Sequence, residues 1–230
     1  MKKADLIRAD FLEAANALTD EVYNGGIHLD VCQGLGELDP FIGNDAPVFF
    51  MYSFYSHLYC AQMHANKLFD TNPDAVTIPE FLRMARTRAT KFQAASEAKV
   101  TDYLVEAQAE IDRLGPTVQL LRARRNDFLA HISRKLAFDK DAIRNAEKLE
   151  FGKISDVLLS GGRIVNDLLQ MWNNSRNQLR EPHSDDYKKV ISRVTKQICA
   201  EIDAHEREFA IYGSAHRLPR PKACDEKPRK

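Results

Sequence analysis

The chain has 230 residues, of which 44% are hydrophobic and 29% are charged, as in an ordinary soluble globular protein. Its 33 basic and 33 acidic side chains leave a formal net charge of zero, which argues against a protein that coats nucleic acid through its overall charge. Any site for an anion must therefore be local. We expect one domain over residues 1–213 and a C-terminal tail over residues 214–230.

The cysteines are scattered along the chain and include no C-x-x-C pair; they are Cys32, Cys60, Cys199 and Cys224. This spacing is typical of reduced, mostly buried thiols and not of a disulfide framework. The N-terminus lacks an apolar signal region, and no run of about 18 apolar residues is present to span a membrane. We therefore expect a cytoplasmic protein that does not enter the membrane.

Helical spacing of apolar residues predicts two helices in the first forty residues. The first runs from Asp5 to Tyr23, and Asn24-Gly25-Gly26 is expected to end it. The second is short, from His28 to Leu38, because a proline at position 40 disfavours helical backbone at the residue before it.

A third helix is predicted from Pro47 to Leu68. It is apolar or aromatic nearly all round, so we expect a central, buried helix, and we interpret its aromatic run over residues 49–59 as core and not as a base-stacking surface. Residues 70–76 form a loop. Thr77-Ile78-Pro79-Glu80 is a capping box that opens the next helix, which extends to about Ala94.

The second half of the chain is also predicted to be helical. Gly115-Pro116 is expected to separate a helix over residues 101–114 from a following basic helix. Residues 139–149 form a connection, and two long helices cover residues 153–179 and 184–212, with Gly161-Gly162 as a candidate kink. Residues 214–230 hold three prolines among six Lys or Arg residues, the composition of a disordered basic tail. No segment alternates like a strand, so the predicted fold class is all-α.

Positive charge gathers around one histidine in the basic helix. The stretch from Arg125 to His131 contains Asn126 and Asp127, and the same helical pattern carries four further cations, Arg122, Arg124, Arg134 and Lys135. His131 is the only histidine between positions 65 and 182. This concentration of charge predicts a site for an anion, with a solvated basic helix face as the alternative.

The spacing of these residues raises a geometric question. On a straight helix Arg125 and His131 are separated by roughly 9 Å along the axis and about 120° around it, whereas Arg124 lies within about 20° of the histidine. Either the helix begins or bends near Arg125, or the long side chain of Arg125 reaches round, or Arg124 is the functional arginine.

Arg125-Asn126 followed by His131 resembles the R-x(4-6)-H signature of the HEPN superfamily, whose members are helical and frequently metal-independent ribonucleases. A second stretch, Asn44 to Phe50 running into a helix that ends at Asp70, resembles the AbiU-like branch, which is linked to phage abortive infection. Together the two stretches suggest similarity over most of residues 1–180. The resemblance implies an HEPN-like helical bundle with additional flanking helices.

The resemblance assigns catalysis to Arg125, Asn126 and His131, because a polar residue directly follows the family's arginine and only Arg125 meets that condition. Histidine suits the proton transfers of RNA cleavage and arginine suits the developing phosphoryl charge. Asp127 is four residues before His131 and either orients its ring or forms a simple ion pair. The phosphate of RNA is expected to contact Arg122, Arg124, Arg134 and Lys135. No metal or cofactor is expected.

The implied activity is that of a metal-independent endoribonuclease, a toxin or antiphage effector. One motif holds one histidine, so the family's composite site implies a homodimer acting on RNA, with a possible cognate antitoxin. The rival interpretation is a non-catalytic HEPN module that binds RNA, a nucleotide or a protein partner. A third, an antitoxin for a nucleotide-modifying partner, has no positive feature in the sequence.

Two further groups of residues have ordinary interpretations that we prefer. His57, Cys60 and His64 could present two imidazoles and a thiolate to zinc from one helix, but no fourth ligand is evident, so we expect polar groups of the core or of an interface. Trp172 is expected to fill the core and not to bind a ligand.

Overall fold

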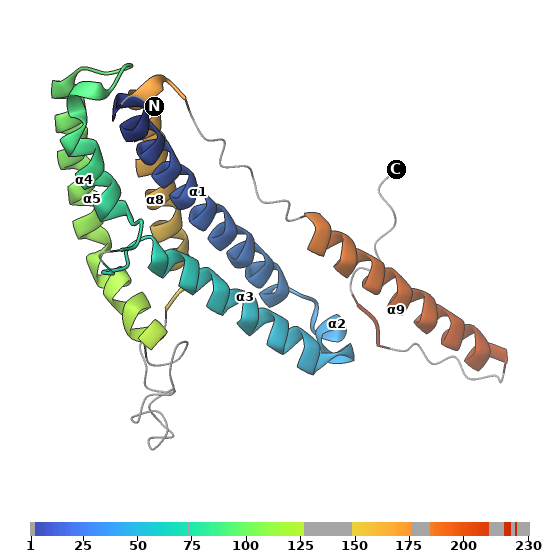
Figure 1. Cartoon of the computed structure of the whole chain (residues 1–230). Helices are drawn as coiled ribbons and strands as arrows, with labels where there is room; N and C mark the ends of the chain where they lie inside the picture. The colour runs from blue at the N-terminus through green and yellow to red at the C-terminus, as the bar shows by residue number, and fades with distance from the viewer. Residues whose placement is uncertain are drawn as a thin grey trace. The chain divides into compact units, whose positions relative to one another are not determined.

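The computed structural model describes residues 3–72, 74–126, 149–175, 185–211, 219–221 and 224. Over these residues the chain forms seven α-helices, one short 3₁₀ helix and no strand, which confirms the predicted all-α class. The helices are α1 (Lys3–Gly36), α2 (Pro40–Asp45), α3 (Pro47–Lys67), α4 (Ile78–Thr87), the 3₁₀ helix η1 (Ala89–Lys91), α5 (Glu97–Arg124), α8 (Phe151–Asn173) and α9 (Asp185–Ile211) (Figure 1).

The chain divides into two compact units, each built from separate stretches. The first unit comprises Met1–Leu29 and Leu58–Pro182, and the second comprises Asp30–His57 and His183–Lys230. The long helices α1 and α3 therefore each contribute one part to either unit. The expected division into a domain over residues 1–213 and a tail does not follow these boundaries and stays a prediction.

In the first unit the apolar faces of α4, α5 and α8 pack against one another and against the first part of α1 (Figure 1). Phe11 of α1 stacks on Phe81 of α4 with ring centroids 4.6 Å apart, and on Trp172 of α8 at 4.4 Å. Phe92 meets the edge of the same indole at 5.0 Å. The prediction that Trp172 belongs to the core is confirmed, since only 4% of it is exposed.

Glycine pairs do not end the helices of this unit as predicted. Helix α1 continues through Gly25-Gly26, because a Cβ on Gly25 would lie 2.6 Å from Leu158 Cδ2 and 3.1 Å from His64 Cβ. The glycine thus lets α1 approach α8 and α3 closely, and this packing offsets the roughly 1 kcal/mol that glycine costs inside a helix. Gly161 makes another such close approach, because a Cβ on it would lie 3.1 Å from Leu68 Cδ1, and α8 continues through it.

The predicted break at Gly115-Pro116 is also wrong, because α5 runs unbroken from Glu97 to Arg124. Pro116 removes one backbone hydrogen bond, but Leu114, Val118 and Leu121 are buried on either side of it. Burying these apolar side chains on both sides holds the helix together across the proline.

The start of α4 follows its predicted capping box. Thr77 Oγ1 accepts a hydrogen bond from the backbone N–H of Glu80 at 3.3 Å. Helix α4 ends at Thr87 and not near Ala94, because the chain then turns to donate backbone hydrogen bonds from Gln93 and Ala94 to the last carbonyls of α8.

The second unit joins α9 to α2 and to the adjoining parts of α1 and α3. Gly34 of α1 leaves room for the ring of Tyr187 of α9, which occupies the space that a Cβ would take. Helix α3 begins at Pro47 as predicted, but its first half is not buried on all sides: Phe49 and Tyr52 each expose 65% of their surface. The interpretation of this aromatic run as core is therefore wrong, because few elements cover it within this unit.

A disulfide corrects the expectation of reduced thiols. Cys199 of α9 is bonded to Cys224, although 25 positions separate them in the sequence. The Cα atoms of the two cysteines lie 5.5 Å apart, a distance that sequence spacing does not reveal. Cys32 is a buried thiol as expected, and burial raises its pKa to about 11, whereas the free Cys60 is exposed.

Part of the predicted disordered tail also has a defined place. Arg220 forms ion pairs with Asp203 at 3.1 Å and Glu206 at 2.5 Å, and Pro221 is buried. Opposite charges and the disulfide hold these few residues against α9, and the expected disorder of the tail as a whole stays a prediction. Among the described residues no helix is both long enough and apolar enough to cross a membrane.

Candidate anion-binding site at the end of α5

The sequence of α5 places its arginines at its C-terminal end. Ser96 caps the first turn by accepting a hydrogen bond from the Lys99 N–H at 3.3 Å, and a stripe of buried apolar residues fixes the helix to the core. The α-helix ends at Arg124, and Arg125 and Asn126 continue as a wider, π-type turn. The winding of the helix therefore changes at Arg125, and because His131 lies outside the described residues the choice between Arg124 and Arg125 stays a prediction.

Three arginines at this end each reach a different oxygen on α3 or just beyond it. Arg122 Nη2 donates to the carbonyl oxygen of Phe69 at 3.1 Å, and Arg124 Nε donates to Gln62 Oε1 at 3.2 Å. A cation at a helix C-terminus is favoured by the partial negative charge there, so these arginines suit the last turn of α5. The Phe69 carbonyl and the Gln62 amide are neutral acceptors, so neither of them cancels the charge of the arginine that it holds.

Arg125 forms an ion pair with a carboxylate that follows α3. Its Nη1 atom lies 2.8 Å from Asp70 Oδ2, and its Nε donates to Asn126 Oδ1 at 3.1 Å. About a quarter of each partner of the Arg125–Asp70 pair is exposed. A guanidinium carries five N–H donors, so two engaged donors hold the group while others can still address an anion.

Asp70 is itself held by the loop that follows α3. Its Oδ1 atom accepts backbone N–H groups from Thr71 at 2.7 Å and from Asn72 at 3.3 Å. Burial alone would raise the pKa of Asp70, but these two hydrogen bonds and the Arg125 charge together lower it. Asp70 is therefore ionised at neutral pH and fixes the direction of Arg125. Sequence reasoning treated this residue only as the start of a loop.

Two buried amides lie on α3 close to this site. Gln62 and Asn66 are each only 2% exposed, one helical turn apart. Because Gln62 Oε1 accepts from Arg124, its amide nitrogen must point the other way, and neither Gln62 Nε2 nor Asn66 Nδ2 has an acceptor among the described residues. Buried donors of this kind favour an acceptor such as a carbonyl or an anion oxygen.

The structure thus brings Arg122, Arg124, Arg125 and Asn126 together at one end of α5. The other predicted site residues, Asp127, His131, Arg134 and Lys135, lie outside the described residues. The residues that sequence reasoning missed are Asp70, Gln62 and Asn66. Gln62 and Asn66 lie in the last part of α3, and Asp70 follows it. The one signal for them in the sequence was the short polar stretch after the apolar run of α3.

The alternative zinc site does not form around His64. Its Nδ1 atom lies 2.6 Å from Glu21 Oε2 of α1, and the other oxygen of that carboxylate binds Lys67 at 3.1 Å. His57 is another residue of this alternative site, and burial lowers its pKa. Within the described ranges no three His, Cys, Asp or Glu side chains are arranged to hold a metal ion.

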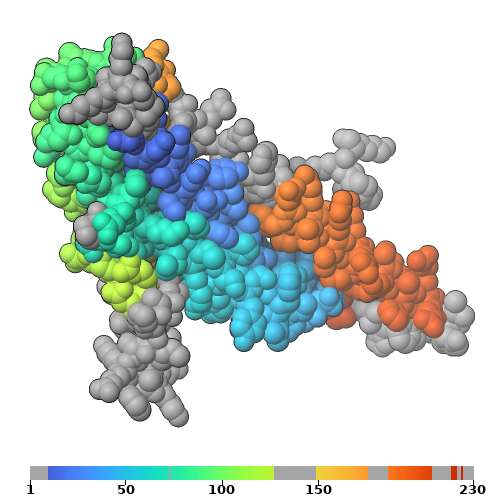
Figure 2. All heavy atoms as spheres, in the orientation of Figure 1, coloured from blue at the N-terminus to red at the C-terminus, as the bar shows by residue number. Residues whose placement is uncertain are grey.

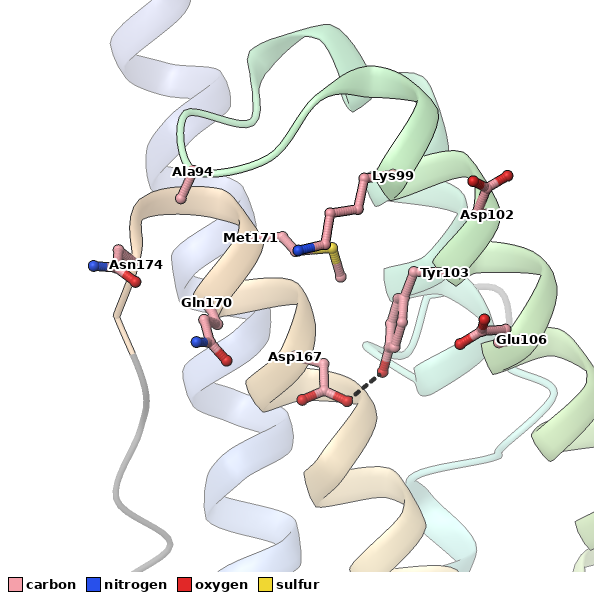
Figure 3. Close-up of a pocket in the computed structure, with 9 residues that line it drawn as sticks. All are labelled: Ala94, Lys99, Asp102, Tyr103, Glu106, Asp167, Gln170, Met171 and Asn174. Atoms are coloured by element: carbon pink, nitrogen blue, oxygen red, sulfur yellow. Dashed lines mark hydrogen bonds between the residues drawn. The ribbon is translucent and has the colours of Figure 1, made fainter.

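A second concave region lies between α5 and the end of α8, a cleft of about 390 Å³ (Figure 3). Its walls carry three carboxylates, from Asp102, Glu106 and Asp167, and one ammonium, from Lys99. The Tyr103 hydroxyl donates to Asp167 Oδ2 at 3.0 Å, and burial followed by the Asp167 charge raises the pKa of Tyr103 far above its ordinary value. Excess negative charge disfavours phosphate here, so the end of α5 is the better anion site.

Comparison with known families identifies the family of this chain. The family model of AbiU2-type HEPN domains matches residues 42–190, well over half of the chain, and the match includes the arginines of α5. The chain belongs to the AbiU2 family of HEPN domains. It is therefore an abortive-infection-related HEPN protein, as the AbiU-like resemblance implied, and its helical fold is consistent with an HEPN bundle.

The matched region of the AbiU2 family begins at residue 42, so α1 lies outside it although the predicted similarity included most of residues 1–180. No curated protein and no solved structure matches the chain.

Proposed function

We propose that this AbiU2-family protein is a metal-independent endoribonuclease that acts as a toxin or antiphage effector. The observation that carries the proposal is the excess positive charge at the end of α5, six residues before His131 in the sequence. The Phe69 carbonyl, the Gln62 amide and the Asp70 carboxylate position Arg122, Arg124 and Arg125 within one turn, and a group of cations positioned in this way suits a phosphate.

The chemistry assigns a distinct task to each residue type. Attack of the RNA 2′-OH on phosphorus needs a proton acceptor, the leaving 5′-oxygen needs a proton donor, and the phosphoryl oxygens need a cation. His131 is the proton-transfer group and Arg125 stabilises the phosphoryl charge. Asn126 helps to hold Arg125 through the 3.1 Å hydrogen bond, and Asp127 orients His131. Arg122, Arg124, Arg134 and Lys135 bind the RNA backbone.

One copy of the motif contains one histidine, and two proton transfers are needed, so the proposed active form is a homodimer whose two α5 ends contribute to one site. Size-exclusion chromatography with light scattering at micromolar protein tests this point. A stable monomer of about 26 kDa that still cleaves RNA would contradict the composite site.

The test of the activity uses purified protein with structured and unstructured RNA in the presence of EDTA. Wild type is expected to cleave with a 2′,3′-cyclic phosphate as product, and His131→Ala to lose at least about 100-fold in rate with RNA affinity nearly unchanged. Circular dichroism shows whether the variant is folded. Full cleavage by folded His131→Ala would mean that the proton-transfer group has been wrongly assigned.

The second candidate function is a non-catalytic module that binds RNA, a nucleotide or a protein such as a cognate antitoxin. The engagement of each arginine by an oxygen of the same chain favours it, because such contacts also serve structure. If wild type leaves every RNA intact but binds it with an affinity that depends on Arg125, this second function replaces the first.

A further inference from the structure

Helix α9 has two chemically different sides. One side carries Tyr187, which packs at Gly34 of α1, and the buried Thr195 and Ile202, and α2 packs against the same helix. The other side carries Lys188, Lys189, Ser192, Arg193 and Lys196, which we call the basic side of α9. At about 100° per residue these five positions fall within about 140° of the helix circumference and extend about 12 Å along its axis.

The basic side is open to solvent. All five of its residues are exposed, and they line a shallow hollow of about 430 Å³. Figure 2 shows the side chains of α9 in orange. Because the packing of Tyr187 against Gly34 fixes the rotation of α9 within its unit, the basic side is held outward by structure and not by chance rotation of a free helix.

Two acids, Asp185 and Asp186, open α9 beside this side. Asp186 pairs with Lys189 at 3.0 Å, but more than half of either side chain is exposed, so the pair is weak. Arg193 and Lys196 form no ion pair with any residue that the structure describes. Residues 185–196 hold four Lys or Arg residues and two Asp residues, so this stretch has a formal charge of +2 in a chain whose net charge is zero.

The same side of α9 continues into an acidic second half, in which two carboxylates share one cation. Asp203 and Glu206 lie on the side that carries the lysines, as does Cys199. The segment bonded to Cys199 places the guanidinium of Arg220 against both carboxylates, at 3.1 Å and 2.5 Å. The carboxylates that would repel a polyanion are therefore paired, and the positive charge of the first half remains.

We infer that the basic side of α9 is a second RNA-contact surface, which binds the phosphates of a single strand apart from the end of α5. The inference rests on the proposed function in that it takes RNA as the polyanion. A row of cations spaced along about 12 Å with a hydroxyl at its centre suits consecutive backbone phosphates and reads no base.

A membrane surface is a poorer partner for this helix. Amphipathic helices bind membranes by inserting their apolar face beneath the headgroups. The apolar face of α9 is occupied by α1 and α2 within its own unit, so only charge is available for binding.

The test measures fluorescence anisotropy of a labelled single-stranded 2′-O-methyl RNA, which lacks the attacking hydroxyl and so reports binding alone. The variant is the full-length triple Lys188→Glu, Arg193→Glu and Lys196→Glu. The matched control is Arg86→Glu, Lys91→Glu and Lys99→Glu, three exposed cations of the first unit with the same change in net charge. Circular dichroism checks both, and neutral Arg193→Gln is a milder second variant.

The α9 triple is expected to weaken RNA binding by at least about tenfold at low salt and to lower the slope of log affinity against log salt by about 2, since each phosphate contact contributes about 0.7. The control is expected to weaken it less than about threefold. Equal weakening by both triples would overturn the inference, because only net charge would then matter. Unchanged RNA affinity with lost binding to anionic phospholipid vesicles would also overturn it.

Failure of this inference can be told apart from failure of the proposed function. If wild type cleaves natural RNA but the α9 triple binds RNA as tightly as wild type, the second surface is wrong and the activity stands. If no RNA is cleaved but the α9 triple alone loses affinity, the surface stands and the activity is wrong.

Discussion

Two groups of arginines lie along α5, and they differ in what neutralises them. In the middle of the helix the Glu110 carboxylate receives Arg113 of α5 at 2.8 Å and Arg163 of α8 at 2.6 Å, with the Ser160 hydroxyl at 2.6 Å. At the end of the helix Arg122 and Arg124 donate to neutral oxygens and Arg125 shares Asp70.

The difference separates a structural cluster from a candidate site. Glu110 has three donors, two of them charged, so it joins α5 to α8 with its own charge fully compensated; the Arg113 and Ser160 hydrogen bonds are the main reasons that its pKa falls to about 2. The end of α5 gathers three arginines within one turn, and two of the acceptors that hold them, the Phe69 carbonyl and the Gln62 amide, carry no charge. Positive charge that is positioned but not neutralised is what a phosphate requires.

Among the variants that test this comparison, Arg125→Ala is expected to have the largest effect on cleavage. It removes the cation that we assign to the phosphoryl oxygens, so cleavage should fall by about 100-fold or more and RNA affinity should fall as well. Arg124→Ala is the matched control, because it removes one neighbouring cation and should lower affinity alone. Rate and affinity are measured separately under single-turnover conditions. A larger loss of rate in Arg124→Ala would make Arg124 the functional arginine.

A smaller effect is expected from Asp70→Asn, which removes the charge that directs Arg125 but preserves the shape of the side chain. The cleavage rate should fall by roughly tenfold, as for other groups that orient a site residue, while RNA affinity stays the same or rises slightly. Asp70→Glu should restore part of the rate. If the rate is unchanged while thermal stability falls, Asp70 serves the fold and does not position Arg125.

The smallest effect is expected from Glu110→Gln, which should lower the free energy of unfolding by about 1 kcal/mol at neutral pH and leave RNA affinity unchanged. The pKa of Glu110 is lower in the folded protein than its ordinary value of 4.5, so its carboxylate stabilises the fold above that value. This contribution is lost as the pH falls toward about 2.

Urea unfolding at pH 7 and at pH 3 measures the Glu110→Gln effect, and the difference between wild type and variant should shrink at the lower pH. A difference that grows as the pH falls would contradict the sign of the shift. A loss of RNA affinity would place Glu110 in the site and remove the contrast between the two arginine groups.

The family, the helical class and one end of the site were accessible from local sequence. Pro47 favours the start of α3 through its own backbone geometry. Thr77 favours the start of α4 through a hydrogen bond with the residue three positions later. The arginines of α5 were identified because charge clustering within a few residues is visible in the sequence. In these cases the cause and the effect lie within one or two helical turns.

Other features depend on residues far apart in the chain, and only the tertiary structure decided them. In the sequence Gly25 resembles a helix stop, but in the structure it lies against Leu158 and His64 within a helix. Pro116 resembles a helix break, but its neighbours are buried in the core. Asp70 becomes a partner of Arg125 only because α3 ends beside the end of α5.

The sequence by itself determined the family, the all-α class and the presence of a local basic site, because composition, helical period and a short motif are carried by neighbouring residues. The tertiary structure alone decided which oxygens hold each arginine, that Cys199 is bonded to Cys224, and that the basic side of α9 faces solvent. Each of these follows from contacts across more than twenty residues of sequence, and such contacts are set by how the helices pack.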